Sequence, residues 1–147
     1  MSDIESRLAR LEDEKAILNR LYAYGHSIDY GHEEVWVDCF TQDGVWDARR
    51  RSGSEHNTVC RGRAELAAFI RTHTRAPMVY HKHMLSEPMI TVEGDHATCD
   101  SYFIRLDVVD DSPTPRVSGM GRYRDKLRRC EDGVWRFSER IAEIESL

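Results

Sequence analysis

Two histidines in alternate positions, His81 and His83, are followed by Glu87 in the segment YHKHMLSEP. Alternate side chains of an extended strand project from the same face, so two imidazoles at this spacing can reach one point. Imidazole and carboxylate groups bind transition metals, and imidazole also titrates near neutral pH. The segment therefore indicates a metal site, an acid–base site, or the interior of an ordinary strand.

The metal alternative is a likeness to the first metal motif of the cupins, because Gly94 follows Glu87 at the cupin spacing. Three observations speak against it. Arg75 stands where that motif opens with glycine, and no second histidine motif follows Gly94. Cupins are double-sheet barrels, whereas about half of this chain precedes the first strands. We therefore expect no metal and no other cofactor.

The acid–base alternative pairs His83 with Asp29, which lies near the end of a long predicted helix. A helix packed across a curved sheet can bring its last turn to the open end of the enclosed space. The Asp29 carboxylate could then accept a hydrogen bond from one ring nitrogen of His83 and leave the other as a general base.

The elements that must position these residues follow from periodicity. Apolar residues at steps of three and four predict a helix that begins at Ser2 or Asp3 and ends at Gly31, and shorter helices are expected over 32–40 and from Gly62. The segment between them contains a short extended VWD and a polar loop. After Pro77 the period becomes two, with turn signals at SEP, EGD, DDSPTP and CEDG, which predicts an antiparallel meander.

Composition narrows the function classes. The chain has 147 residues and a formal charge of −5, with basic residues interspersed among acidic ones, so nucleic acid is not an expected partner. No apolar run is long enough for a secretion signal or a membrane span, and we expect no membrane partner and a cytoplasmic protein. Three helices followed by a sheet predict one α+β domain over residues 1–147.

The segments LYAYGHSIDYGHEEVWVDCFTQDGVWD, RGRAELAAFI, HKHMLSEPMITVEGDHATCDSYF and DGVWRFSERI resemble, in order and spacing, the SnoaL-like branch of the nuclear transport factor 2-like (cystatin-like) superfamily. This branch includes polyketide cyclases, scytalone dehydratase, bile-acid 7α-dehydratase and hexachlorocyclohexane dehydrochlorinase. The resemblance covers about Ile17 to Ile141. It implies a cone-shaped fold in which N-terminal helices pack on a curved, mainly antiparallel sheet.

The resemblance also implies site residues. Dehydratase-like members pair an aspartate at the end of the first helix with a histidine on the strand after the third helix, often with a tyrosine five residues before the aspartate. These positions are Asp29, His83 and Tyr24 here. Glu87 stands where the family often has asparagine, which leaves its role and the substrate open.

Four further residues are expected in or near the pocket. Asp100 alternates with apolar residues on its strand, Trp46 is a candidate pocket wall, Arg140 is in the place of an arginine that some relatives direct at the substrate, and His81 neighbours His83. Asp100 is a candidate pocket acid or hydrogen-bond acceptor. The other three have plainer alternatives, which are a core position for Trp46, a solvent-side salt bridge for Arg140 and a core histidine for His81.

The function implied is a cofactor-independent dehydratase, other lyase or isomerase that acts on a small hydrophobic, ring-containing substrate by Asp–His acid–base catalysis. The alternatives are a non-catalytic small (beta) subunit of a ring-hydroxylating dioxygenase, a ligand-binding module and, last, a cupin-like metal enzyme. Self-association as a dimer or trimer is expected through the second face of the sheet, to which Phe103, Val109 and Ile141 were assigned.

Overall fold

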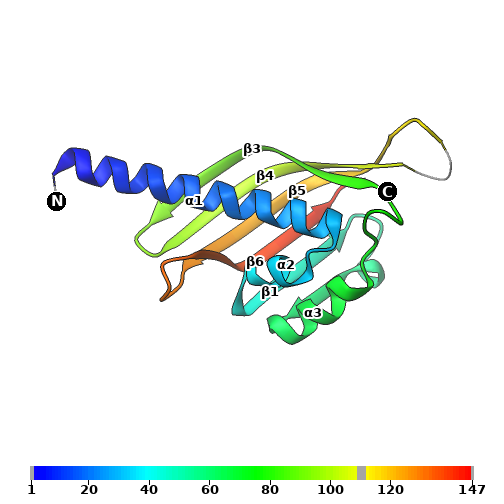
Figure 1. Cartoon of the computed structure of the whole chain (residues 1–147), viewed down its shortest axis with the longest axis horizontal. Coiled ribbons are helices and arrows are strands. Elements are labelled where there is room, and N and C mark those ends of the chain that lie inside the picture. The colour runs from blue at the N-terminus through cyan, green and yellow to red at the C-terminus, as the bar shows by residue number, and fades with distance from the viewer. Residues whose placement is uncertain (1, 109–111, 147) are drawn as a thin grey trace.

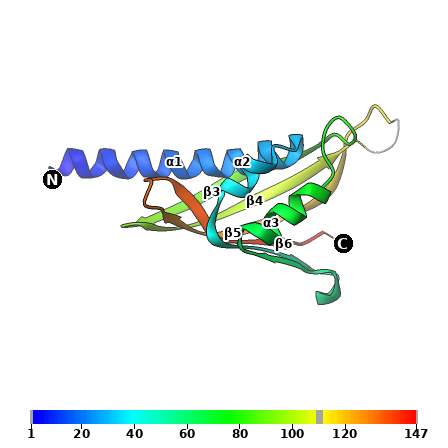
Figure 2. The same ribbon diagram turned by 60° about the horizontal axis from the view of Figure 1, so that its bottom comes forward.

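The computed structural model describes residues 2–108 and 112–146. The helices are α1 (Asp3–Tyr30), α2 (Glu33–Asp38), the short 3-10 helix η1 (Ser54–His56) and α3 (Gly62–Thr72). The strands are β1 (Phe40–Arg50), β2 (Thr58–Arg61), β3 (His81–Glu93), β4 (His96–Asp107), β5 (Arg116–Arg129) and β6 (Trp135–Ile144). Helices α1, α2 and α3 lie on one face of the sheet (Figures 1 and 2), which confirms the predicted α+β class and its layered arrangement.

Helix α1 begins and ends where the sequence predicts. The Ser2 side chain accepts a hydrogen bond from the Glu5 amide while the Glu5 carboxylate accepts one from the Ser2 amide, which forms a capping box. Gly31 ends the helix in the left-handed region at φ 71°, where a residue without Cβ is favoured. The helix is buried only from Ile17 onward, and its first turns project beyond the sheet (Figure 1).

The six strands form one sheet in the order β2-β1-β6-β5-β4-β3. Strands β3 to β6 are the antiparallel meander that the turn signals predict. The prediction was incomplete at the other side of the sheet, where β1 is an eleven-residue strand parallel to β6 and the polar loop contains β2. A parallel pair needs a long crossover, and local turn signals do not reveal it.

Strand β3 corrects a second detail. The SEP segment was predicted as a turn between two strands, but β3 runs through it without interruption. The register against β4 shifts between Ser86 and Met89, and Glu87 has φ 52°. The turn signal therefore marks a β-bulge, in which one strand carries an extra residue.

The two faces of the sheet differ from the predicted assignment. Phe103 is buried against the helices, which corrects its expected place on the second face. Ile141 is half-buried, and Val109 lies outside the described residues. Exposed large apolar side chains on the strands include Met84, Met89, Tyr102, Ile104, Val117 and Met120. Self-association through this face stays a prediction.

No helix within the described part of the chain combines the length and apolar character needed to cross a membrane.

Candidate functional site

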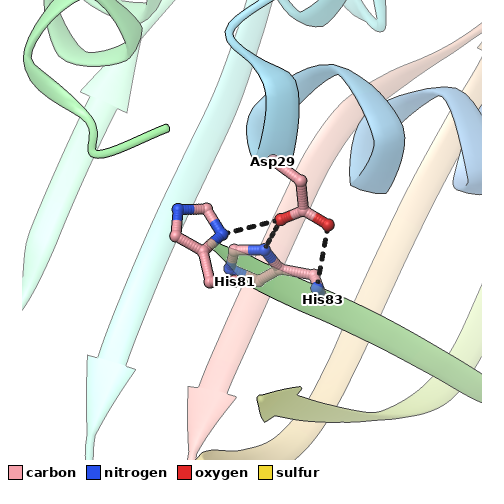
Figure 3. Close-up of side chains that lie close together, drawn as sticks. All are labelled: Asp29, His81 and His83. Atoms are coloured by element: carbon pink, nitrogen blue, oxygen red, sulfur yellow. Dashed lines mark hydrogen bonds and ion pairs between the residues drawn. The ribbon is translucent and has the colours of Figure 1, made fainter. Parts of the chain in front are cut away.

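The last turn of α1 presents Asp29 to the start of β3 (Figure 3). Asp29 is 4% exposed and its carboxylate accepts three hydrogen bonds from two histidines. Two of these come from ring nitrogens to Oδ1, and the third comes from the His83 backbone amide to Oδ2. A carboxylate buried away from water needs such partners, so this cluster joins the helix to the edge strand.

His83 is held at one ring nitrogen and free at the other. Its Nδ1 lies 2.6 Å from Asp29 Oδ1, and its backbone nitrogen lies 3.1 Å from Oδ2. Because a carboxylate accepts, His83 carries its proton on Nδ1. Its Nε2 has no hydrogen-bond partner among the described residues, and the side chain lines a cavity between the sheet and α3. This is the geometry of an oriented general base.

His81 is engaged at both ring nitrogens. Nδ1 lies 2.9 Å from Asp29 Oδ1, and Nε2 lies 2.6 Å from the carbonyl oxygen of Thr74. The residue is 1% exposed and does not line that cavity. This corrects its assignment to substrate binding, because neither nitrogen is free for a ligand.

Asp29, His81 and His83 are also the candidate metal ligands among the described residues, since their ligand atoms lie within 4.8 Å of one another. The two nitrogen–oxygen separations, 2.9 and 2.6 Å, are hydrogen-bond distances. Ligand atoms around a tetrahedral ion at about 2.0 to 2.2 Å would be separated by about 3.3 to 3.6 Å. The cluster as built fits protons between its members and does not fit an ion.

The electrostatics of the pair favour an ionised acid and a neutral base. Burial acts to raise the pKa of Asp29, but hydrogen bonds from His81 and His83 outweigh it and hold that pKa below its ordinary value. Burial lowers the pKa of His83, against the opposing effect of Asp29. The Arg105 guanidinium and the neighbouring His81 also lower the pKa of His83.

A cavity of about 520 Å³ opens beside His83. Its wall includes the aromatic side chains of Tyr24, Trp46, Phe69, Phe103 and Tyr123. The same lining includes the charged side chains of Arg50, Arg105 and Asp107. The volume and the aromatic part of the wall suit a small ring-bearing molecule.

Tyr24 and Trp46 both line this cavity, as expected for them, and they are bonded to each other. The indole Nε1 of Trp46 donates to the Tyr24 hydroxyl oxygen at 2.9 Å. That oxygen therefore accepts from Trp46 and keeps its own hydrogen for another acceptor. Burial raises the pKa of Tyr24 to about 12, although the nearby Arg140 opposes the rise, so the phenol is protonated at neutral pH.

His73, which sequence reasoning missed, also lines the cavity. Its ring centroid lies 5.3 Å from that of His81 and 6.0 Å from that of His83. Burial lowers the pKa of His73 to about 4, so it is neutral at pH 7. The only local signal is its place immediately after α3, as the C-cap residue.

Arg140 is neither a solvent-side residue nor part of the cavity wall, which corrects both expectations for it. The side chain is fully buried and forms two hydrogen bonds of 2.8 Å with Asp125. Its guanidinium lies 4.2 Å from the ring centroid of Tyr24 and 3.9 Å from that of Tyr123. Arg140 therefore packs against two aromatic rings that line the cavity, on the side of the rings away from it.

Asp100 and Glu87 lie away from the cavity. The Asp100 side chain is 64% exposed on the outer face of β4, 3.9 Å from Arg124, which corrects its assignment as a pocket acid. The neighbouring inner positions are the smaller Cys99 and Ser101, so the apolar pattern of Asp100, Tyr102 and Ile104 indicated the wrong face. Glu87 is exposed on the β3 bulge, at a positive φ that asparagine adopts readily.

The profile of the SnoaL-like domain matches residues 9–141. Comparison with curated proteins gave no match. A protein of Novosphingobium aromaticivorans described as NTF2-like with a cystatin-like fold is 29% identical, with a TM-score of 0.81, covering 97% of this chain and 88% of its own.

Two more distant structures share the fold. The beta subunit of a putative aromatic-ring-hydroxylating dioxygenase from Novosphingobium aromaticivorans is 21% identical, with a TM-score of 0.77 and coverage of 95% and 93% of the two chains. A protein of Catenulispora acidiphila solved in complex with S-DNPA is 24% identical, with a TM-score of 0.74 and coverage of 91% and 94%.

Proposed function

Because the chain belongs to the SnoaL-like domain family, we propose that it is a cofactor-independent lyase or isomerase for a small hydrophobic, ring-containing substrate, with elimination of water as its reaction. One observation carries the proposal: His83 lines the aromatic cavity with a free Nε2 while its Nδ1 is bonded to a buried carboxylate. A wall residue without a chemical role would not need this orientation.

In the proposed reaction His83 Nε2 removes a proton from a substrate carbon next to a carbonyl group. The carbon–hydrogen pair becomes a carbon–carbon double bond as the carbon–oxygen bond to a neighbouring hydroxyl breaks. The departing hydroxide takes the proton from His83 and leaves as water, so His83 returns to its neutral form. Asp29 holds the tautomer and stabilises the transient imidazolium, since its carboxylate faces Nδ1.

Tyr24 is assigned to the oxygen on which negative charge develops. Its phenol is protonated at neutral pH, and Trp46 fixes the oxygen at the cavity wall. A donor that is already oriented stabilises an oxyanion without reorganisation. An isomerase would use the same residues, with His83 returning the proton to a different carbon.

Proton exchange tests this proposal before the natural substrate is known. The protein is incubated in D₂O with a panel of cyclic ketones and β-hydroxy ketones, and deuterium incorporation and loss of water are followed by mass spectrometry. We expect exchange with at least one ring compound, reduced about 10² to 10⁴-fold in His83→Gln. His96→Gln, at an exposed histidine on β4, is the matched control. Equal exchange in His83→Gln and the unsubstituted protein would remove His83 from the mechanism.

The rival function is a binding or structural module, as in the dioxygenase beta subunit that shares the fold. The two proposed functions differ in what happens to a bound ring compound. A binding module would take up ring compounds, seen as shifts in NMR spectra, without proton exchange on any of them. Light scattering of the purified protein tests the predicted dimer or trimer, which a monomer at micromolar concentration would contradict.

A further inference from the structure

The hydrogen-bond partners of His81 determine where its protons are. The Thr74 carbonyl oxygen can only accept, so His81 Nε2 carries a hydrogen. Asp29 Oδ1 also accepts, so His81 Nδ1 carries one as well. An imidazole with hydrogen on both nitrogens is a cation. A neutral ring would direct a lone pair at one of these oxygens, at 2.9 or 2.6 Å.

We propose that His81 is an imidazolium in this hydrogen-bonded arrangement and acts as a positioning residue, which balances the Asp29 carboxylate so that His83 stays a neutral base. The role of His83 in this statement rests on the proposed function, whereas the charge of His81 does not. In this proposal His81 carries the positive charge that balances Asp29, and His83 accepts the proton of the substrate.

The surroundings separate the two rings. His81 is 1% exposed and faces acceptors at both ends, whereas His83 reaches the cavity with Nε2 unbonded among the described residues. The rings are nearly perpendicular, with centroids 5.3 Å apart, and share one carboxylate oxygen. A second cation there would be opposed by burial and by repulsion from the first. The Asp29 carboxylate therefore supports one imidazolium and one neutral ring. Asp107, which is not hydrogen-bonded to either ring, also acts electrostatically on His81.

Other titratable and charged groups around the pair do not replace Asp29. Arg105 on β4 acts on His83 as a second positive charge and is bonded to Asp107 through Nε. His73, after α3, is neutral at pH 7. Lys82 donates to the His81 carbonyl oxygen and lies over the ring of Tyr30. Among the described residues, Asp29 is the carboxylate that is hydrogen-bonded to either ring.

The positive charge on His81 affects the protonation of His83. A lone carboxylate beside an imidazole favours the protonated ring, which would remove the base near neutral pH. With His81 beside it, the carboxylate still orients Nδ1 of His83 but favours its imidazolium less. The cavity therefore holds a base that is free over a wider pH range.

Nitrogen-15 NMR of the histidine-labelled protein tests the charge directly. At pH 7 we expect His81 to show two protonated ring nitrogens and His83 to show one protonated nitrogen, Nδ1, and one unprotonated nitrogen, Nε2. The spectra of His81→Gln and His83→Gln assign the signals. An unprotonated nitrogen on His81 at pH 7 would overturn the proposal, and this measurement needs no substrate.

The positioning role is tested by titrating His83 in the His81→Gln protein. Glutamine keeps an amide donor but no charge, so the midpoint for protonation of His83 should rise by about one pH unit. His96→Gln is the control and should leave the midpoint in place. An unchanged midpoint in His81→Gln would show that His81 has only a structural role. Because the resting protein is titrated, this outcome is independent of whether proton exchange is detected.

Discussion

The Asp29 carboxylate contacts His83 at two points, since Oδ1 lies 2.6 Å from the ring Nδ1 and Oδ2 lies 3.1 Å from the backbone nitrogen. The side chain and the strand that carries it are therefore held by one group. Rotation of the ring and sliding of β3 past α1 would each break a hydrogen bond to a buried carboxylate. This double contact restricts both the ring of His83 and the start of β3, so the position of the candidate base is well defined.

Replacement of Asp29 tests that relationship. Asp29→Asn keeps the shape but removes the charge and turns one oxygen into a donor, so it opposes the tautomer of His83 that exposes Nε2. We expect proton exchange to fall by about 10² to 10⁴-fold. Asp100→Asn, at a side chain 64% exposed on the outer face, is the matched control and should retain full exchange. Loss of exchange in the control would restore Asp100 as a pocket acid.

The decline of the proton-exchange rate at low pH should reflect protonation of His83. Burial lowers the pKa of His83 below its ordinary value of 6.5. The base must be unprotonated to work, so the midpoint of the decline in rate on acidification should lie below pH 6.5. The measurement is the pH dependence of exchange at low substrate concentration. A midpoint at or above that value would mean that His83 is more basic than its surroundings predict.

The pH dependence of the free energy of unfolding should include a contribution from protonation of His73. Burial lowers its pKa from 6.5 to about 4 in the folded protein. Below pH 6.5 the unfolded chain binds a proton that the folded chain takes up only near pH 4, so the free energy of unfolding falls over this window. For His73 alone the loss between pH 7 and pH 5 is about 1 to 2 kcal/mol.

Urea unfolding of His73→Asn at both pH values checks this prediction. The variant should lose less stability than the unsubstituted protein on going from pH 7 to pH 5, because the asparagine does not titrate. His96→Asn, at an exposed position, should keep the full dependence. Parallel curves for His73→Asn and the unsubstituted protein would place the titration elsewhere, with His83 as the next candidate.

The Arg140–Asp125 pair should be the most costly ion pair to break. Both side chains are 0% exposed, so Asp125→Asn leaves a buried guanidinium with no countercharge. We expect a loss of about 3 to 5 kcal/mol in the free energy of unfolding. The control Glu143→Gln removes a partner of the more exposed Arg122, where solvent screens the charges and the expected loss is much smaller. Equal losses in the two variants would mean that Arg140 does not support the aromatic rings of the cavity wall as proposed.

A metal should have no effect on the cluster. The separations of 2.9 and 2.6 Å around Asp29 fit protons and leave no room for an ion. Elemental analysis after dialysis should therefore give no stoichiometric metal, and EDTA should leave the histidine NMR signals unchanged. A metal retained in a one-to-one ratio, with altered signals for both His81 and His83, would require the cluster to open around an ion.

Local patterns in the sequence determined the helices and the meander. The cap residue Ser2 and the left-handed Gly31 mark the ends of α1 as predicted, because caps and periodicity act over only a few residues. The change of period after Pro77 located strands β3 to β6 for the same reason. The pairing of Asp29 with His83, by contrast, was implied by family resemblance, since residues 54 positions apart leave no local signal of contact.

Tertiary structure alone decided which faces and which partners these residues have. A period of two shows that side chains alternate but not which set is buried. Asp100, Tyr102 and Ile104 were expected to face the pocket, but all three are exposed on the outer face of β4. The charge of Arg140 suggested the surface, yet Asp125 and aromatic rings compensate its burial. His81 acquires its role only when α1 and the Thr74 carbonyl oxygen meet β3, because the protonation of an imidazole depends on the atoms that face both of its nitrogens.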